Sequence, residues 1–218
     1  MKYKLIILLL LAVLFPAGST SADEGDEYMP DEDQRRQILD GKVISIPVHT
    51  DDKGGMVWGA IRIDAPARAI FDSIVYCNGE SSAHKSMRHC KTLEKTPEYE
   101  IAEHQIKFHW LVPRQTYLFR GDYTGVTKIR FRVLEGDLKK LDGGWDMFPI
   151  EGEDALLVRY YATIQPKFPT PRWLIRKSLK KEIPAMLKVM KELSENPEKI
   201  AALDAAEEKR LAKAAKRR

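Results

Sequence analysis

The clearest pattern in the chain is a helical repeat of apolar residues between Pro171 and Leu193. Apolar side chains recur there every three or four positions, whereas most of the lysines and arginines fall elsewhere on the helical wheel. Thr170 can cap such a helix, Pro171 suits its first turn, and the Asn196-Pro197 pair can end it. At 1.5 Å per residue this helix would be about 34 Å long. A helix of this length with one apolar face requires a broad partner surface.

The preceding hundred residues predict that surface, because they divide into short strand-like runs separated by turn residues. The expected strands cover residues 42–49, 56–63, 87–95, 99–110, 115–123, 126–134, 139–148 and 154–165. Helical spacing after Asp64 predicts a short helix over residues 65–75. Between residues 126 and 134, Ile129, Phe131 and Val133 alternate with basic residues. One face of the sheet should therefore be buried and the other solvated.

The side chains that this pattern turns inward include Tyr, Trp and Met as well as aliphatic residues. They are Tyr117, Phe119, Phe131, Trp145 and Tyr160 from the sheet, with Ile183, Met186, Leu187 and Met190 from the long helix. Such a mixture suits a ligand cavity with a few polar groups. A closely packed core made of the same residues is the alternative. We take these nine residues as the candidate lining of a cavity between sheet and helix.

Several local strings resemble those of a known family. IRIDAPARAIFDSI resembles its strand-to-helix entry, FHWLVPRQTYLFR its Pro-containing strand connection, RVLEGDLKKLDGGWDMFPI its strand-turn-strand with a Gly-x-Trp element, and FPTPRWLIRKSL the opening of its last helix. The family is the START-like superfamily, in its polyketide cyclase/dehydrase-like and coenzyme Q-binding branch. The resemblance covers residues 42–194. It implies an α+β helix-grip fold, in which a curved antiparallel sheet wraps around one long C-terminal helix and a short helix follows the N-terminal strands.

The first 22 residues have the three-part layout of a secretory signal. Lys2 and Lys4 precede an apolar run from Leu5 to Phe15, which is about half of the ~20 residues that a membrane-spanning helix needs. We expect residues 1–22 to be removed on export, with an uncleaved anchor as the alternative. The location that follows is outside the cytoplasm, in the periplasm.

Charge is concentrated at the two ends of the expected domain. Residues 23–41 form an acidic N-terminal extension, and residues 195–218 form an Ala-rich, charged tail that can be helical. We expect both to be solvated. The formal net charge is +4 and falls to +2 without the two lysines of the signal segment. The basic tail could contact a membrane surface or nucleic acid. Because an exported protein rarely meets nucleic acid, we expect no nucleic-acid partner.

The two cysteines, Cys77 and Cys90, flank the loop CNGESSAHKSMRHC, which departs from the family's pattern. An exported chain with two cysteines and no thiol-redox or metal motif most simply uses them as a bridge. We therefore predict a disulfide between them, which would stabilise the fold by about 3 kcal/mol.

Common motifs of catalysis and cofactor binding are missing. The chain has no Gly-x-Gly-x-x-Gly, phosphate loop, Gly-x-Ser-x-Gly or His-Glu-x-x-His motif, so we expect no cofactor and no metal. The histidines, which we expect to be surface or satisfied residues without metal-ligand spacing, are His49, His84, His89, His104 and His109. His104 and His109 should face opposite sides of one strand. Asp122, Glu103 and Asp146 could act as acids or bases only if buried.

These patterns favour a monomeric, non-enzymatic carrier or sensor of a hydrophobic molecule such as a lipid, quinone, sterol or hopanoid. The resemblance also implies an alternative, a cyclase or dehydratase acting on a polyketide-like substrate in the same cavity. Pro184 lies inside the long helix and predicts a kink. The kink would either bend the helix around the sheet or let it gate the cavity.

Overall fold

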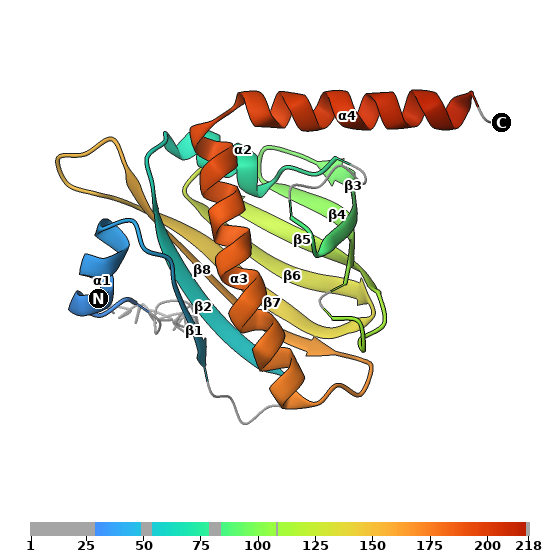
Figure 1. The fold of residues 1–218 in the computed structure, drawn as a ribbon, viewed down its shortest axis with the longest axis horizontal. Helices are drawn as coiled ribbons and strands as arrows, with labels where there is room; N and C mark the ends of the chain where they lie inside the picture. The colour runs from blue at the N-terminus through green and yellow to red at the C-terminus, as the bar shows by residue number, and fades with distance from the viewer. Residues whose placement is uncertain (1–28, 49–53, 79–83, 108, 217–218) are drawn as a thin grey trace, which may run out of the picture.

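The computed structural model describes residues 29–48, 54–78, 84–107 and 109–216. Their eight strands form one antiparallel sheet in the order β1-β2-β8-β7-β6-β5-β4-β3 (Figure 1). The strands are β1 (Ile44–Val48), β2 (Gly55–Ile63), β3 (Met87–Lys95), β4 (Tyr99–Ile106), β5 (Gln115–Thr124), β6 (Lys128–Gly136), β7 (Leu138–Pro149) and β8 (Leu156–Pro166). The helices are α1 (Glu32–Leu39), α2 (Ala67–Ile74), α3 (Arg172–Glu195) and α4 (Glu198–Ala215).

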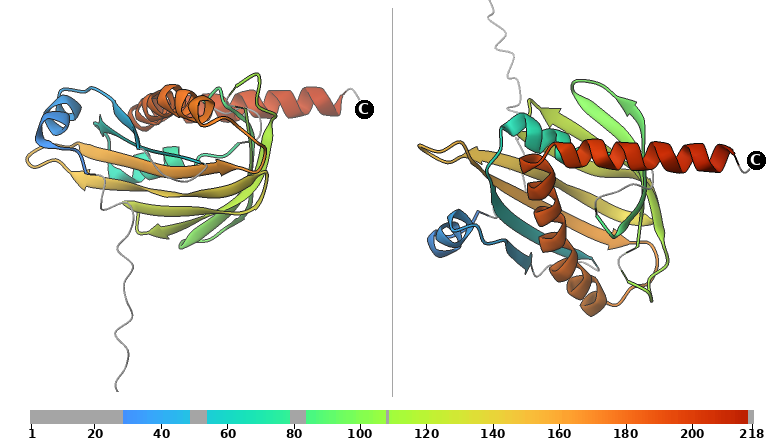
Figure 2. Two further views of the ribbon diagram at one scale, coloured as in Figure 1. Left: turned by 90° about the horizontal axis from the view of Figure 1, so that it is seen from below. Right: turned by 45° about the horizontal axis from the view of Figure 1, so that its top comes forward.

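Helix α3 crosses the concave face of the curved sheet, as Figure 1 and Figure 2 show from different directions. It contacts β1, β2 and α2. The main core lies between this helix and the sheet, with Val57, Ile70 and Leu187 among its fully buried residues. The expected α+β helix-grip arrangement is therefore confirmed, including the short helix after the N-terminal strands.

A second, smaller core lies on the opposite face of the sheet and involves α1. Ile38 is 0% exposed and packs with Trp58, Leu157 and Tyr161. Asp31 caps α1, because its side chain accepts a hydrogen bond from the Gln34 amide and the Gln34 side chain accepts one from the Asp31 amide. The expectation that residues 23–41 are a solvated extension is wrong for α1, since one apolar side chain of this helix completes the outer core.

Helix α4 also contacts the domain, in contrast to the expectation of a solvated tail. The hydroxyl of Tyr76 donates a 3.0 Å hydrogen bond to the Asp204 carboxylate, and the Asn78 amide donates to the same oxygen. Glu207 is 4% exposed and pairs with Arg210. The residues that attach α4 are polar, which is why the shortage of large apolar residues in the tail did not reveal this contact.

Three local expectations differ from the structure. Thr170 does not cap α3: Pro171 occupies the cap position, and the Thr170 hydroxyl donates to the Phe168 carbonyl at 3.0 Å. Strand β4 ends at Ile106, so His109 lies in the following loop and not on the same strand as His104. Helix α3 continues through Pro184 to Glu195.

No helix in the described ranges is long and apolar enough to cross a membrane. The signal segment predicted over residues 1–22 and His49 lie outside the described residues.

A candidate ligand cavity between the sheet and helix α3

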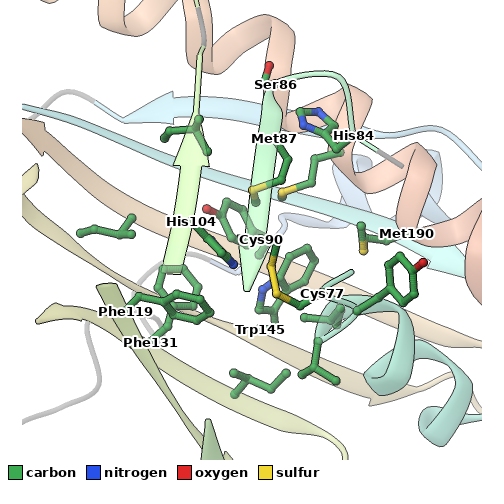
Figure 3. Close-up of a pocket in the computed structure, with 18 of the residues that line it drawn as sticks. Cys77, His84, Ser86, Met87, Cys90, His104, Phe119, Phe131, Trp145 and Met190 are labelled. Atoms are coloured by element: carbon green, nitrogen blue, oxygen red, sulfur yellow. A yellow bond between two sulfur atoms is a disulfide. The ribbon is translucent and has the colours of Figure 1, made fainter. Parts of the chain in front are cut away.

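A cavity of about 210 Å³ lies between the concave face of the sheet, helix α3 and the segment that follows α2 (Figure 3). Most of its wall is carbon. The lining aliphatic residues include Ile129, Leu138, Leu141, Ile164 and Leu179, and Met87, Met186 and Met190 add flexible thioether side chains. An apolar cavity of this kind can remove much of the surface of a hydrophobic molecule from water.

The cavity collects eight of the nine residues that the alternation pattern marked. They are Tyr117, Phe119, Phe131, Trp145, Tyr160, Ile183, Met186 and Met190. Three of the aromatic rings form a group, with Tyr160 4.6 Å from Trp145 and 5.9 Å from Phe131 between ring centroids. Leu187 is the exception, because it is 0% exposed and packs directly against the sheet.

The predicted disulfide between Cys77 and Cys90 is confirmed. Their Cα atoms are 5.2 Å apart, and the bridge joins the segment after α2 to β3 beside the cavity. A ring nitrogen of His104 lies within 4.8 Å of both sulfur atoms. Because both sulfurs are in the disulfide, neither is available as a thiolate ligand for a metal in this state.

His104 lies in the cavity wall on β4, next to two aromatic side chains (Figure 3). Its Nδ1 is 3.4 Å from the Tyr117 hydroxyl, and its ring centroid is 4.3 Å from that of Phe119. Burial, with a smaller contribution from His89, lowers the pKa of His104 to about 3. The imidazole is therefore neutral at physiological pH.

Three polar side chains join α3 to the segment that precedes β3. The Ser86 hydroxyl donates a hydrogen bond to the Glu182 carboxylate, and His84 Nε2 lies 3.7 Å from the same carboxylate. Desolvation lowers the pKa of His84, although the Glu182 charge opposes this change. All three residues line the cavity, so they form a polar border on a mostly apolar space.

Glu100 is the most deeply buried acidic residue of the cavity wall. It lies on β4, is 5% exposed, and its Oε2 has no hydrogen-bond partner in the described part of the chain. Burial raises the pKa of this carboxyl group, while Lys95 and Tyr123 act in the opposite direction.

The acids that the sequence suggested for catalysis do not line the cavity. Along each strand, successive side chains point to opposite faces of the sheet. An odd number of positions separates Glu103, Asp122 and Asp146 from cavity-lining residues of their own strands, so these three acids lie on the other face. There, Asp122 pairs with Arg120 and Arg132, and Asp146 pairs with Arg130 and the buried Arg159. Asp122 and Asp146 therefore serve as partners in ion pairs on that face, and no catalytic role is needed to account for them.

Sequence reasoning missed Glu100, His104 and the Ser86–Glu182 contact. A signal for the first two exists in β4, where Glu100, Ala102, His104 and Ile106 alternate and share one face. The other face of β4 also carries apolar residues, Tyr99 and Ile101, so the alternation does not show which of the two faces lines the cavity. The Ser86–Glu182 contact joins residues 96 positions apart, and no local pattern indicates it.

Comparison with known proteins agrees with this fold and cavity. The sequence profile of the family described as polyketide cyclase / dehydrase and lipid transport matches residues 63–191. Since this match spans more than half of the chain, the chain belongs to that family, and its fold is START-like. A search of curated proteins found no match.

Solved structures show the same fold at low sequence identity. A STAR-related lipid transfer protein fragment from Xanthomonas axonopodis is 16% identical with a TM-score of 0.60, over 70% of this chain and 93% of that chain. Human STARD10 is 12% identical with a TM-score of 0.55, over 78% and 82%. A START superfamily protein from Mycobacterium smegmatis is 16% identical with a TM-score of 0.54, over 64% and 97%.

Proposed function

We propose that this protein binds one hydrophobic molecule of the lipid, quinone, sterol or hopanoid type in the cavity and releases it unchanged. The observation that carries this proposal is the mostly carbon-lined cavity of about 210 Å³ between the sheet and α3. An engineered apolar cavity of about 150 Å³ is enough to bind benzene. Transfer of apolar surface from water into such a space is worth about 25 cal/mol per Å².

The composition of the wall supports a binding role for molecules of irregular shape. Met87, Met186 and Met190 adapt their side chains to different ligands. Trp145 and Tyr160 supply large apolar surfaces with a polar edge that can meet a headgroup. The family description includes lipid transport, which agrees with this role.

The competing function is a cyclase or dehydratase acting on a polyketide-like substrate, and titratable groups in the cavity favour it. Glu100 and His104 are both available for proton transfer inside an apolar space. However, the pKa of His104 is lowered to about 3, so its imidazole is a weak base at neutral pH, and we prefer binding without conversion.

The proposed location is outside the cytoplasm, in the periplasm, and the disulfide between Cys77 and Cys90 supports it, because such bridges persist in oxidising compartments. Residues 1–22 would then be an export signal and residues 42–194 the ligand-binding domain of a monomer without a nucleic-acid partner. The basic second half of α4 would add contact with a membrane surface.

Binding can be tested with protein purified without detergent. Organic extraction followed by mass spectrometry should find one co-purified apolar molecule, and a fluorescent lipid or quinone analogue should bind with saturation. Trp145→Ala or Met190→Lys should weaken this binding at least about tenfold, because the first removes contact surface and the second places a charge in an apolar space. Trp173→Ala is the matched control, since Trp173 is 60% exposed.

Absence of any bound molecule in wild-type protein would overturn the proposal. Time-dependent conversion of a polyketide-like probe that is lost in His104→Gln or Glu100→Gln would support the enzyme instead.

A further inference from the structure

Two polar groups beside the cavity lack hydrogen-bond partners within the residues that the structure describes. They are Oε2 of Glu100 and the hydroxyl of Tyr123, both of which are buried. Glu100 lines the cavity, and the Tyr123 ring packs edge-on against Phe71 of α2 with a centroid distance of 4.9 Å. Buried polar groups are almost always hydrogen-bonded in folded proteins. The two side chains interact with each other, and each shifts the pKa of the other. Because neither atom has a partner at full hydrogen-bond geometry among the described residues, the pair has capacity for one further partner.

The local backbone leaves room for that partner. Glu100 pairs with Gly121 across β4 and β5, and Tyr123 lies two positions further along the same face of β5. A Cβ atom on Gly121 would stand at ordinary contact distances, 3.8 Å from Glu100 Cγ and 3.6 Å from the Phe119 ring, so the absence of a side chain on this glycine leaves space for a group of about methyl size beside Glu100. Burial and the neighbouring Glu100 carboxyl group raise the pKa of Tyr123. The phenol is therefore protonated and able to donate a hydrogen bond.

The chemistry of the pair selects one type of ligand group. A carboxyl oxygen accepts a hydrogen bond in either protonation state, whereas the phenol donates one. A hydroxyl group can satisfy both, because it donates to one partner and accepts from the other. We propose that Glu100 and Tyr123 bind the hydroxyl group of an amphiphilic alcohol whose apolar body fills the rest of the cavity. This inference rests on the proposed function and narrows its ligand class.

Paired probes test the inference without any mutation. Wild-type protein should bind 1-decanol at least about tenfold more tightly than its methyl ether, which cannot donate a hydrogen bond, in competition with the fluorescent analogue. Tyr123→Phe and Glu100→Leu should reduce this preference to less than about threefold. Glu103→Gln is the matched control, because it changes an acid on the same strand that faces away from the cavity, and it should keep the preference.

The outcomes separate this inference from the proposed function. Equal affinity of wild-type protein for the alcohol and the ether would overturn the hydroxyl site while leaving the apolar cavity as a binding site. A preference that survives in both Tyr123→Phe and Glu100→Leu would also overturn it. Failure of every probe to bind would overturn the proposed function.

A second, independent observation concerns the surface around the N-terminal end of α3, which is the end opposite to α4. Four large apolar side chains are exposed there: Trp110 (77%), Leu111 (52%), Phe168 (49%) and Trp173 (60%). Trp110 and Leu111 lie on the β4–β5 loop, Phe168 lies on the segment that leads from β8 into α3, and Trp173 lies in the first turn of α3. The β4–β5 loop and the start of α3 are side by side in Figure 1 and Figure 2. Val112 and Leu174 line one small groove between these segments. We call the four exposed residues the aromatic end.

Basic residues surround the aromatic end. No acidic residue occurs between positions 155 and 181, and the segment from 167 to 181 contains Lys167, Arg172, Arg176, Lys177, Lys180 and Lys181. The nearby carboxylate of Asp137 accepts a hydrogen bond from the Thr116 amide. Exposed Trp residues among cations are typical of surfaces that contact lipid headgroups, and anionic lipid attracts the cations. We infer that the aromatic end docks on an anionic bilayer.

Vesicle flotation tests this docking surface. Wild-type protein should bind vesicles that contain phosphatidylglycerol, bind pure phosphatidylcholine vesicles weakly, and lose binding at high salt. The double variant Trp110→Ser/Trp173→Ser should lose at least about tenfold in affinity. Truncation after Arg210 is the comparison variant, because it removes the basic end of α4 and leaves the aromatic end intact. It should lose less than about threefold in affinity, since the tail only adds to the docking of the aromatic end.

The inference would be overturned if the truncated protein no longer bound the vesicles, or if the double variant bound them as well as wild type. Dimerisation of wild-type protein that the double variant removes would also overturn it, because the aromatic end would then be a contact between two copies.

Discussion

Gly59 on β2 lies directly under Leu187 of α3. A Cβ atom on this glycine would stand 3.0 Å from Leu187 Cδ1 and 3.0 Å from the Ile44 carbonyl oxygen. The helix therefore approaches the sheet closely at a position without a side chain. This contact explains why Leu187 is packed against β2, whereas Met186 and Met190 line the cavity.

Replacement of Gly59 should separate helix and sheet. Gly59→Val should destabilise the fold by at least about 2 kcal/mol, because the new side chain overpacks the contact with Leu187. Urea unfolding measures this change. Gly121→Ala is the control, since a Cβ atom there meets only ordinary contact distances of 3.6 Å or more. Equal stability of both variants would show that the helix moves freely on β2.

The repeating patterns of the sequence predicted the fold, because alternation in the strands and the period of three to four in α3 each report which face is buried. Those patterns also selected the aromatic and Met residues of the cavity. They did not identify Leu187 as a packing residue, because Leu187 and Met186 satisfy the same helical period and only the contact with Gly59 distinguishes them. The polar groups of the cavity depend on contacts between distant segments, such as Ser86 with Glu182.

The bridge between Cys77 and Cys90 should leave no free thiol in denatured, unreduced protein, since the structure joins both cysteines. The double variant Cys77→Ala/Cys90→Ala should be less stable by about 3 kcal/mol, because the unfolded chain gains freedom when a short loop is opened. Thiol titration and urea unfolding test the two statements. Two reactive thiols in the unreduced wild-type protein would contradict the bridge.

The first half of α4 should contribute to stability, in contrast to its basic second half. Deletion of residues 200–218 removes the hydrogen bonds of Asp204 with Tyr76 and Asn78. Hydrogen bonds to a charged group contribute about 1.5–3 kcal/mol, so the melting temperature should fall by roughly 3–10 °C. Deletion of residues 211–218 should leave it unchanged. If both truncated proteins had the melting temperature of the full chain in a thermal unfolding experiment, the Asp204 contacts would contribute nothing to stability.

The ion pair between Asp146 and Arg159 should matter for folding and not for ligand binding. Arg159 is 1% exposed and its guanidinium is 2.7 Å from the Asp146 carboxylate. Asp146→Asn removes the charge that compensates this cation and should cost about 3–5 kcal/mol. Asp122→Asn affects a more exposed pair and should cost at most about 1 kcal/mol. Loss of ligand affinity per folded molecule in Asp146→Asn would instead indicate a role in the site.

His104 should make the fold less stable in mild acid. Its pKa is lowered to about 3 in the folded protein, below the value of about 6.5 in an unfolded chain. Folding therefore favours the neutral imidazole: this stabilisation is complete above pH 6.5 and declines as the pH falls toward 3. The lowered pKa of His84 acts in the same direction, whereas the raised pKa of Glu100 acts in the opposite one.

Comparison of variants isolates this contribution, because the effects of His84 and Glu100 are common to both proteins. Between pH 7 and pH 4.5, wild-type protein should lose about 2 kcal/mol more of its free energy of unfolding than His104→Phe does. Urea unfolding at several pH values measures the difference, with His109→Gln in the β4–β5 loop as the control. Parallel pH profiles for wild type and His104→Phe would mean that the imidazole takes up its proton in the folded state as easily as in water, and that His104 is not enclosed by the cavity wall.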